Sequence, residues 1–157
     1  NRFGIQTGIM GAAYLGNKTE LQIEFLYGTR GSKYSTRSNL ILAYKLNYID
    51  VPFILSFKDW FYESTKSKYF KLHFQGGFYL GRLISSTSID QAMLDKSFKK
   101  FDFGWLLGFT YYSNVHWGFT GRFTNSVTPL LRYVNSQGED IRMISYFISL
   151  GLTYRFN

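Results

Sequence analysis

The sequence contains no cysteine and only two prolines. The lack of cysteine excludes a disulfide framework, a thiol nucleophile and any metal site built on thiolates. No window approaches 18 uninterrupted apolar residues, so a transmembrane helix is excluded as well. The chain begins at Asn1 with neither an initiator methionine nor a basic and then apolar leader. Any export signal is therefore expected to lie outside the printed sequence.

Aromatic residues, by contrast, are abundant. They make up 20% of the 157 residues, with 13 Tyr and 16 Phe, which is more than a soluble core of this size needs. The length predicts a single domain, residues 1–157. The net charge of +8 indicates an anionic partner, which could be nucleic acid, anionic lipid or lipopolysaccharide phosphate. The mean hydropathy of −0.14 does not argue against a membrane protein if lipid-facing and lumen-facing residues alternate.

The last stretch, residues 143–156, shows the clearest pattern. Every even-numbered residue from Ile144 to Phe156 is apolar or aromatic, and the odd-numbered residues from Ser145 to Arg155 are small or polar except for Phe147. This period of two predicts a β-strand whose two faces meet different environments. Soluble strands have about five or six residues, whereas about 9–11 tilted residues span a bilayer. We therefore interpret this stretch as the closing strand of an outer-membrane barrel.

Six earlier segments alternate in the same way and predict further strands: 3–14, 19–31, 40–57, 68–85, 101–112 and 117–125. The connections are alternately short (15–18, 59–67, 113–116) and long (31–38, 86–100, 126–142). Transmembrane barrels show this asymmetry, with short periplasmic turns and longer outer loops. Within 40–57 the apolar face changes register after Tyr48, which predicts a β-bulge near Ile49 and Asp50.

The distribution of residue types distinguishes two kinds of barrel. A soluble up-and-down barrel such as a lipocalin also alternates, but its apolar face points inward and its charges point outward. Here one face of each predicted strand is bulky and aromatic, and the other carries glycines and most of the in-strand charges, which suit a narrow lumen. We predict an all-β fold, a transmembrane antiparallel up-and-down β-barrel in the bacterial outer membrane.

The predicted strands number seven, which is odd. Bacterial single-chain barrels have an even number of strands, and an unpaired edge in lipid is costly. Eight strands are therefore expected, with the first one missing before Asn1, so that the domain is N-terminally incomplete. The full polypeptide or a partner chain would supply that strand.

Several short motifs, taken in order, resemble the PorT-type outer-membrane β-barrel domain of Bacteroidetes, a small OmpA-like barrel. They are LQIEFLYGTRGSK (21–33), LNYIDVPFILSF (46–57), GGFYLGRLIS (76–85), FDFGWLLGFTY (101–111) and GLTYRF (151–156). The resemblance implies eight strands, with one before position 1. It also implies insertion by the outer-membrane assembly machinery through a terminal aromatic signal, here Tyr154 and Phe156. The family has no shared enzymatic activity.

Nine charged or titratable residues are expected to point into the lumen: Glu24, Arg30, Lys45, Asp50, Lys71, His73, Asp102, Arg122 and Arg155. An eight-stranded barrel is just wide enough for side chains to fill it, so these groups must pair with one another. Glu24 and Asp102 are the expected anions, and their expected partners are Arg122, Lys71 and Lys45. The narrow width favours a structural plug over an ion or solute path.

A barrel lipase or deacylase would need a Ser–His pair near the outer rim. His73 and His116 are the only histidines, and neither has a serine in an evident partnering position. No catalytic residue, metal site or cofactor is therefore expected.

Cations are in excess on the side of the long loops. The candidates for contacts with lipopolysaccharide phosphates are Lys33, Arg37, Arg82, Lys99 and Lys100. Solubility of the loops explains these charges equally well. Nucleic acid is not an expected partner, because the aromatic residues lie on the lipid face instead of interleaving with Lys and Arg. The expected partners are outer-membrane lipid, lipopolysaccharide and other outer-membrane proteins.

These observations favour a non-enzymatic outer-membrane protein, a structural barrel or an accessory subunit of a larger complex. The alternatives are a lipid-modifying enzyme that hydrolyses lipid A or phospholipid, and a narrow solute pore.

Overall fold

The computed structural model describes residues 4–156 apart from 36–40, 66, 89–99, 129–130, 135–139 and 144–145. Within its strands, the side chains of residues 30–35, 41–45, 86–88, 131–134 and 140–143 lie outside the description. All the regular structure in the described part is β-strand. No described segment forms a helix that is long and apolar enough to cross a membrane.

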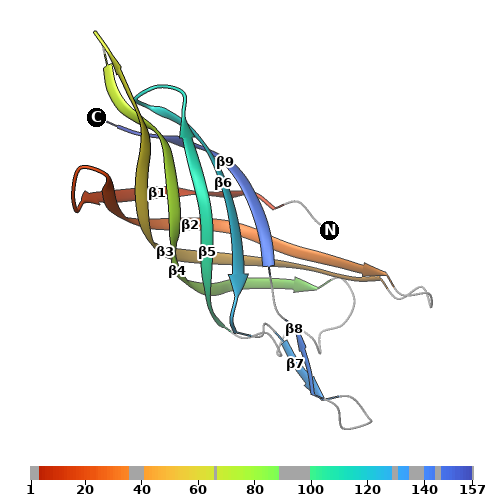
Figure 1. Ribbon diagram of the computed structural model, residues 1–157. Coiled ribbons are helices and arrows are strands. Elements are labelled where there is room, and N and C mark those ends of the chain that lie inside the picture. The colour runs from red at the N-terminus through yellow and green to blue at the C-terminus, as the bar shows by residue number, and fades with distance from the viewer. Residues whose placement is uncertain are drawn as a thin grey trace.

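Nine strands are present in the described part (Figure 1): β1 (Gln6–Tyr14), β2 (Thr19–Ser35), β3 (Ile41–Ser64), β4 (Ser67–Ser88), β5 (Phe101–Tyr112), β6 (Trp117–Ser126), β7 (Leu131–Val134), β8 (Asp140–Met143) and β9 (Tyr146–Tyr154). Seven of them form one antiparallel sheet in the order β1-β2-β3-β4-β5-β6-β9. The up-and-down topology is therefore as predicted. The separate β7–β8 hairpin lies within the segment predicted as the long loop 126–142.

Alternating residues sort the side chains to the two faces of this sheet, most clearly along β5. Asp102, Leu106 and Thr110 are buried, whereas Phe103 and Phe109 between them are exposed. Because successive side chains of a strand point to opposite faces, this pattern places most of the buried polar residues on the concave side, together with a few large apolar ones such as Leu106. Most of the large apolar side chains remain outside.

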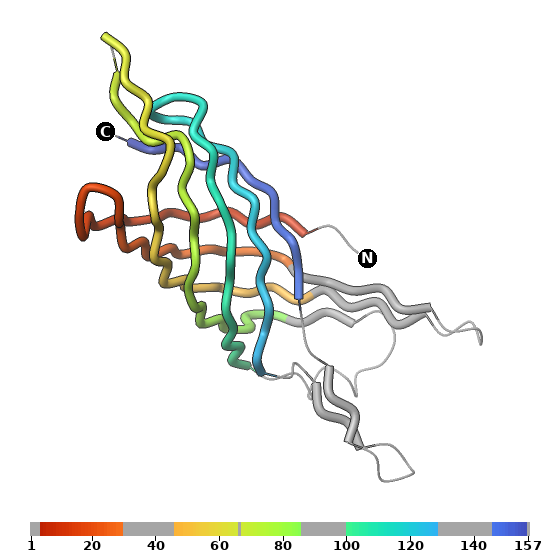
Figure 2. The backbone as a smooth tube through the Cα atoms, in the orientation of Figure 1, coloured from red at the N-terminus to blue at the C-terminus, as the bar shows by residue number. Residues whose placement is uncertain are grey.

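The strands curl strongly, as the smooth backbone trace shows (Figure 2). Each strand of the sheet is antiparallel to its neighbours, so β1 and β9 at its two edges run in the same direction. Among the described residues, β1 and β9 do not contact each other. One strand antiparallel to both would fit between them, and the eighth strand stays a prediction.

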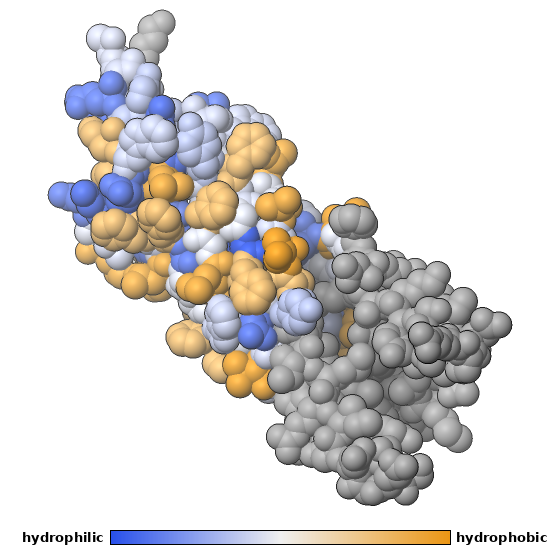
Figure 3. Space-filling model, turned by 45° about the vertical axis from the view of Figure 1, so that its right-hand side comes forward, coloured by the Kyte–Doolittle hydropathy of each residue, from blue (hydrophilic) through white to orange (hydrophobic). Residues whose placement is uncertain are grey.

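The outer face is strongly apolar. Exposed fractions reach 85% for Leu150, 75% for Ile148 and 60% for Phe78. Figure 3 shows one face of the molecule, on which large apolar side chains are spread over the described strands. A monomeric soluble protein rarely exposes a contiguous apolar surface of this extent. The outer face of this sheet therefore suits the hydrocarbon of a bilayer.

Two side chains of β3 lie on the opposite face of the sheet from the one predicted. Leu46 and Tyr48 were expected on the apolar outer face, but they are 1% and 0% exposed and lie on the same face as Asp50. β3 therefore keeps one register throughout, without the predicted bulge near Ile49 and Asp50. The irregularity lies in β4 instead, where Ile84 is the extra residue opposite Asn47 and Tyr48 of β3.

Three strands are longer than the sequence pattern indicated. β2 continues to Ser35, β4 continues to Ser88, and β3 and β4 extend through the predicted turn 59–67 to form a hairpin. This hairpin projects beyond the short-turn end of the neighbouring strands (Figure 1). It carries the rings of Trp60, Phe61 and Tyr62, and Trp60 has a positive φ of 55°. The aromatic residues of this segment therefore belong to paired strands.

Replacement of an outward-facing residue with arginine tests the orientation of the sheet. Leu150 lies at the middle of β9, and Leu150→Arg is expected to lower the free energy of unfolding by about 2–4 kcal/mol, because the charge enters the bilayer midplane. Tyr146→Arg at the end of the strand is the matched control and should cost about 0–1 kcal/mol. Denaturant titration in lipid vesicles measures both. Equal losses at the two positions would contradict the depth dependence.

Candidate functional site

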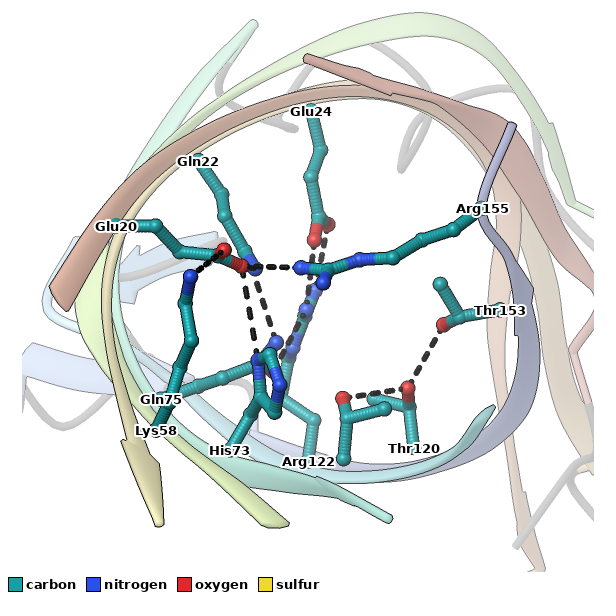
Figure 4. Close-up of polar contacts among 11 residues, drawn as sticks. Glu20, Gln22, Glu24, Lys58, His73, Gln75, Thr120, Arg122, Thr153 and Arg155 are labelled. Carbon is teal, nitrogen blue, oxygen red and sulfur yellow. Dashed lines mark hydrogen bonds and ion pairs between the residues drawn. The ribbon is translucent and has the colours of Figure 1, made fainter. Parts of the chain in front are cut away.

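The concave face of the sheet encloses a polar lumen. Figure 4 shows side chains from β2, β3, β4, β6 and the end of β9 converging there. Its central contact is a bidentate ion pair in which Arg122 of β6 donates from Nη1 and Nη2 to the two carboxylate oxygens of Glu24 on β2, at 2.8 and 2.9 Å. The two side chains are only 10% and 7% exposed. The pair therefore joins two strands that are separated by three others in the sheet.

A second cluster surrounds Glu20, which is fully buried near the short-turn end of the lumen. Lys58 Nζ lies 3.0 Å from its Oε2, and Arg155 Nη2 donates to its Oε1. His73 Nδ1 lies 3.6 Å from Oε1, and the imidazole packs against the ring of Tyr112 with centroids 4.7 Å apart. One carboxylate thus joins side chains from β3, β4 and the segment after β9.

Two glutamines connect these clusters. Arg122 donates to Gln75 Oε1 at 3.2 Å, Gln75 Nε2 donates to Gln22 Oε1 at 3.1 Å, and Gln22 Nε2 donates to Glu20. The chain of donors runs without interruption from Arg122 to Glu20 (Figure 4). Because buried polar groups are costly unless they are bonded, this network makes a charged interior tolerable.

Hydroxyl groups form two further contacts. Thr110, Thr120 and Thr153 are joined side chain to side chain across β5, β6 and β9, with two oxygen–oxygen distances of 2.8 Å. Towards the long loops, Asp102 accepts hydrogen bonds from Tyr79 at 2.9 Å, from Thr128 at 2.9 Å and from Ser126. Hydroxyl groups thus contribute hydrogen bonds at more than one level of the described lumen.

The middle of the lumen has almost no free space. A cavity there, bordered by Arg122, Asp50 and Tyr79, has a volume of about 10 Å³. A cavity needs about 10–15 Å³ by this measure to hold a single water molecule. The side chains therefore fill the described lumen at this level.

The lumen residues predicted from the sequence divide into three groups. Glu24, Asp50, His73, Asp102, Arg122 and Arg155 lie in the lumen. The side chains of Arg30 and Lys45 are outside the described residues. The prediction for Lys71 was wrong, because its ammonium lies over the rings of Tyr62 and Trp60, at 4.4 and 5.3 Å, on the projecting hairpin. Lys71 lies at the base of this hairpin, next to Leu72, which pairs with Tyr111 of β5.

Sequence reasoning missed Glu20 and Lys58, which form the most densely paired cluster. Both follow the alternation already visible in the sequence, since Glu20 has the parity of Glu24 on β2 and Lys58 has the parity of Asp50 on β3. Glu20 lies at the start of its strand, and Lys58 lies just beyond the predicted end of the other. Glu20 lies inside the predicted strand 19–31, so its parity alone would have found it, whereas Lys58 requires the alternation of 40–57 to be extended by one residue.

The predicted outer cations are only partly visible. Arg82 and Lys100 are exposed, and the Arg82 guanidinium lies 5.9 Å from the ring centroid of Phe101. Lys33, Arg37 and Lys99 are outside the described side chains.

At the opposite end of the sheet, the rings of Tyr154 and Phe156 pack edge to face with centroids 5.0 Å apart. Both rings lie on the outer surface, and their role as an assembly signal stays a prediction.

The two histidines have structural neighbours. His116 Nδ1 lies 3.0 Å from the carbonyl oxygen of Arg155, and its ring stacks on Tyr154 with centroids 5.6 Å apart. His73 is 1% exposed and faces Glu20 and Tyr112. Within the part of the chain that the structure describes, no group of three or more His, Cys, Asp or Glu residues is placed to hold a metal ion.

A curled antiparallel sheet with an apolar exterior and an ion-paired lumen defines an outer-membrane β-barrel. The chain matches the family model described as "Outer membrane protein beta-barrel domain" over residues 1–132. It therefore belongs to this family, and its location is the bacterial outer membrane. Searches of curated proteins and of solved structures each returned no match.

Removal of one partner from the central ion pair gives a direct test of its role. Glu24→Leu leaves Arg122 buried without its carboxylate and is expected to lower the free energy of unfolding by about 3–5 kcal/mol. Adding Arg122→Met should recover most of this loss, because no unpaired charge remains. Denaturant titration of both variants in detergent micelles measures the difference.

The control is Glu63→Leu on the projecting hairpin, where Glu63 pairs with Lys68 and both side chains are exposed. Its loss should be no more than about 1 kcal/mol, because water screens the pair. A double variant at Glu24 and Arg122 that is as unstable as the single variant would show that the buried pair is not the source of the loss.

Proposed function

We propose that the protein is a non-enzymatic outer-membrane barrel of the PorT type found in Bacteroidetes. In this proposal it serves as a structural or accessory subunit of a larger outer-membrane complex. The observation that carries the proposal is the plugged lumen, with the ion pair between Glu24 and Arg122 crossing it and only about 10 Å³ free beside it. A barrel without a through path presents its walls, loops and turns to partners. The proposed function therefore depends on contacts made by these surfaces.

The outer surface supports partners of two kinds. Its walls are apolar and suit lipid or the wall of another barrel. Arg82 and Lys100 are exposed cations on the side of the long loops, where lipopolysaccharide phosphates would lie in an outer leaflet. Contacts with lipopolysaccharide and with other outer-membrane proteins are therefore part of the proposal.

Two alternative functions have less support. A lipid hydrolase would need an accessible Ser–His pair near the rim, whereas His73 is buried beside Glu20 and His116 bonds a backbone carbonyl. A solute pore would need a continuous path, and the network from Arg122 to Glu20 lies across it. Both alternatives can be tested directly.

The plugged lumen predicts that the full-length protein conducts no ions in planar lipid bilayers. Replacing both Glu24 and Arg122 with alanine removes the ion pair that crosses the lumen, so this variant should show small conductance steps. The variant serves as a control that inserted barrels are detected, and heat-dependent gel mobility checks that both proteins are folded. Steady single-channel steps from the unaltered protein would favour the pore instead.

The accessory role predicts a stable complex in the native membrane. Affinity purification of the tagged full-length protein from detergent-solubilised membranes should yield at least one other outer-membrane protein at constant stoichiometry. A tagged unrelated eight-stranded barrel at the same expression level is the control for nonspecific capture. Recovery of the protein alone, together with lipid hydrolysis that His73→Asn abolishes, would overturn the proposal in favour of the enzyme.

A further inference from the structure

A cavity opens at the short-turn end of the lumen and is distinct from the plugged middle. Its volume is about 210 Å³, and its walls include Lys58, Lys68, His73, Tyr112 and Arg155. Since about 10–15 Å³ by this measure holds one water molecule, the cavity has room for several. Pockets for drug-sized ligands measure about 300–1,000 Å³. The size therefore suits a small ion or a small solute group.

The charge of this cavity is unbalanced. None of the described residues that line it is Asp or Glu, whereas Lys58, Lys68 and Arg155 are cations. Lys68 is neutralised by Glu63. Lys58 and Arg155, however, share the single carboxylate of Glu20, which leaves one net positive charge at the floor of the cavity. Because an unbalanced buried charge is costly, the site gains from a bound anion.

The two cations that share Glu20 are held in fixed positions. Lys58 is 5% exposed, and its ammonium lies 4.0 Å from the ring centroid of Tyr14 while it contacts Glu20. The Arg155 guanidinium lies 4.8 Å from the ring centroid of Tyr112. Donors that are already ordered lose little conformational entropy when a ligand binds. Hydrogen bonds from them to an anion are charge-assisted and therefore strong.

We propose that this mouth of the lumen is a binding site for a small oxyanion, the phosphate or carboxylate group of a solute. Lys58 and Arg155 bind the anionic oxygens, and the ring of Tyr112 forms part of the wall. In outer-membrane barrels the short turns face the periplasm, so the site draws its ligand from that compartment. The assignment goes beyond the accessory role and does not depend on it, because a plugged barrel can bind an anion with or without a protein partner.

The test uses the full-length protein in detergent micelles, with inorganic phosphate followed by ³¹P NMR line broadening and acetate as a competing carboxylate. Lys58→Met balances the charge of the cluster, so its affinity for phosphate should fall by about tenfold. Glu20→Gln raises the net charge of the cluster from one to two, so it should bind phosphate more tightly. Competition by acetate shows a site for either oxyanion, and its absence restricts the site to phosphate.

Lys18→Met is the matched control, because Lys18 is an exposed cation at the same end and does not line the cavity. It should leave the affinity for phosphate within about twofold of that of the unaltered protein, because water and salt screen an exposed charge. Heat-dependent gel mobility confirms folding. If Lys58→Met does not fold, Glu20→Gln still decides, since a damaged lumen would weaken binding instead of strengthening it. Failure of the unaltered protein to bind either anion, or equal weakening by Lys18→Met and Lys58→Met, overturns the proposal.

Discussion

The bidentate ion pair between Glu24 and Arg122 is the contact on which the rest of the structure depends. A sheet in a bilayer must place its polar side chains on one face and bring that face together away from lipid. With its centre this narrow, the sheet can hold ionised groups only if each finds a partner across the lumen. Arg122 meets Glu24 from the opposite wall, and its second contact with Gln75 leads through Gln22 to the cluster around Glu20. Curvature of the sheet and pairing of the charges therefore require each other.

This constraint also limits what the barrel can do. Groups that neutralise one another across the centre close the path that a channel would need, and they leave little space beside Arg122. The chemistry that remains lies at the two ends and on the outer wall. At the short-turn end, the charges around Glu20 do not balance, so a cavity with cationic walls forms where the network stops. At the other end, Asp102 is held by hydroxyl groups below the long loops. The wall itself is apolar and available to lipid or to another protein.

Most of the fold could be predicted from the sequence, because a period of two is a direct consequence of strand geometry and survives wherever the two faces meet different solvents. This period located the strands, their order and the polar face that contains Glu24 and Arg122.

The sequence pattern failed where the lumen is apolar. Leu46 and Tyr48 are buried inside with Ile54, so hydrophobicity alone gave the wrong face for Leu46 and Tyr48. It also failed at strand ends. Lys71 follows the parity of His73, yet its ammonium lies over the rings of Trp60 and Tyr62 on the neighbouring strand, and no local pattern predicts that contact. Pairings such as Arg155 with Glu20 depend on how the whole sheet curls, which sequence spacing does not contain.

The most direct test of the account measures which face of a strand meets lipid. The chain has no cysteine, so a single cysteine introduced at each position of β5, residues 101–112, carries a spin label without further changes. Collision rates with lipid-soluble oxygen, measured by electron paramagnetic resonance in vesicles, should alternate along the strand. Maxima are expected at Phe103, Leu107 and Phe109 and minima at Asp102, Leu106 and Thr110. The opposite phase, or no period of two, would contradict it.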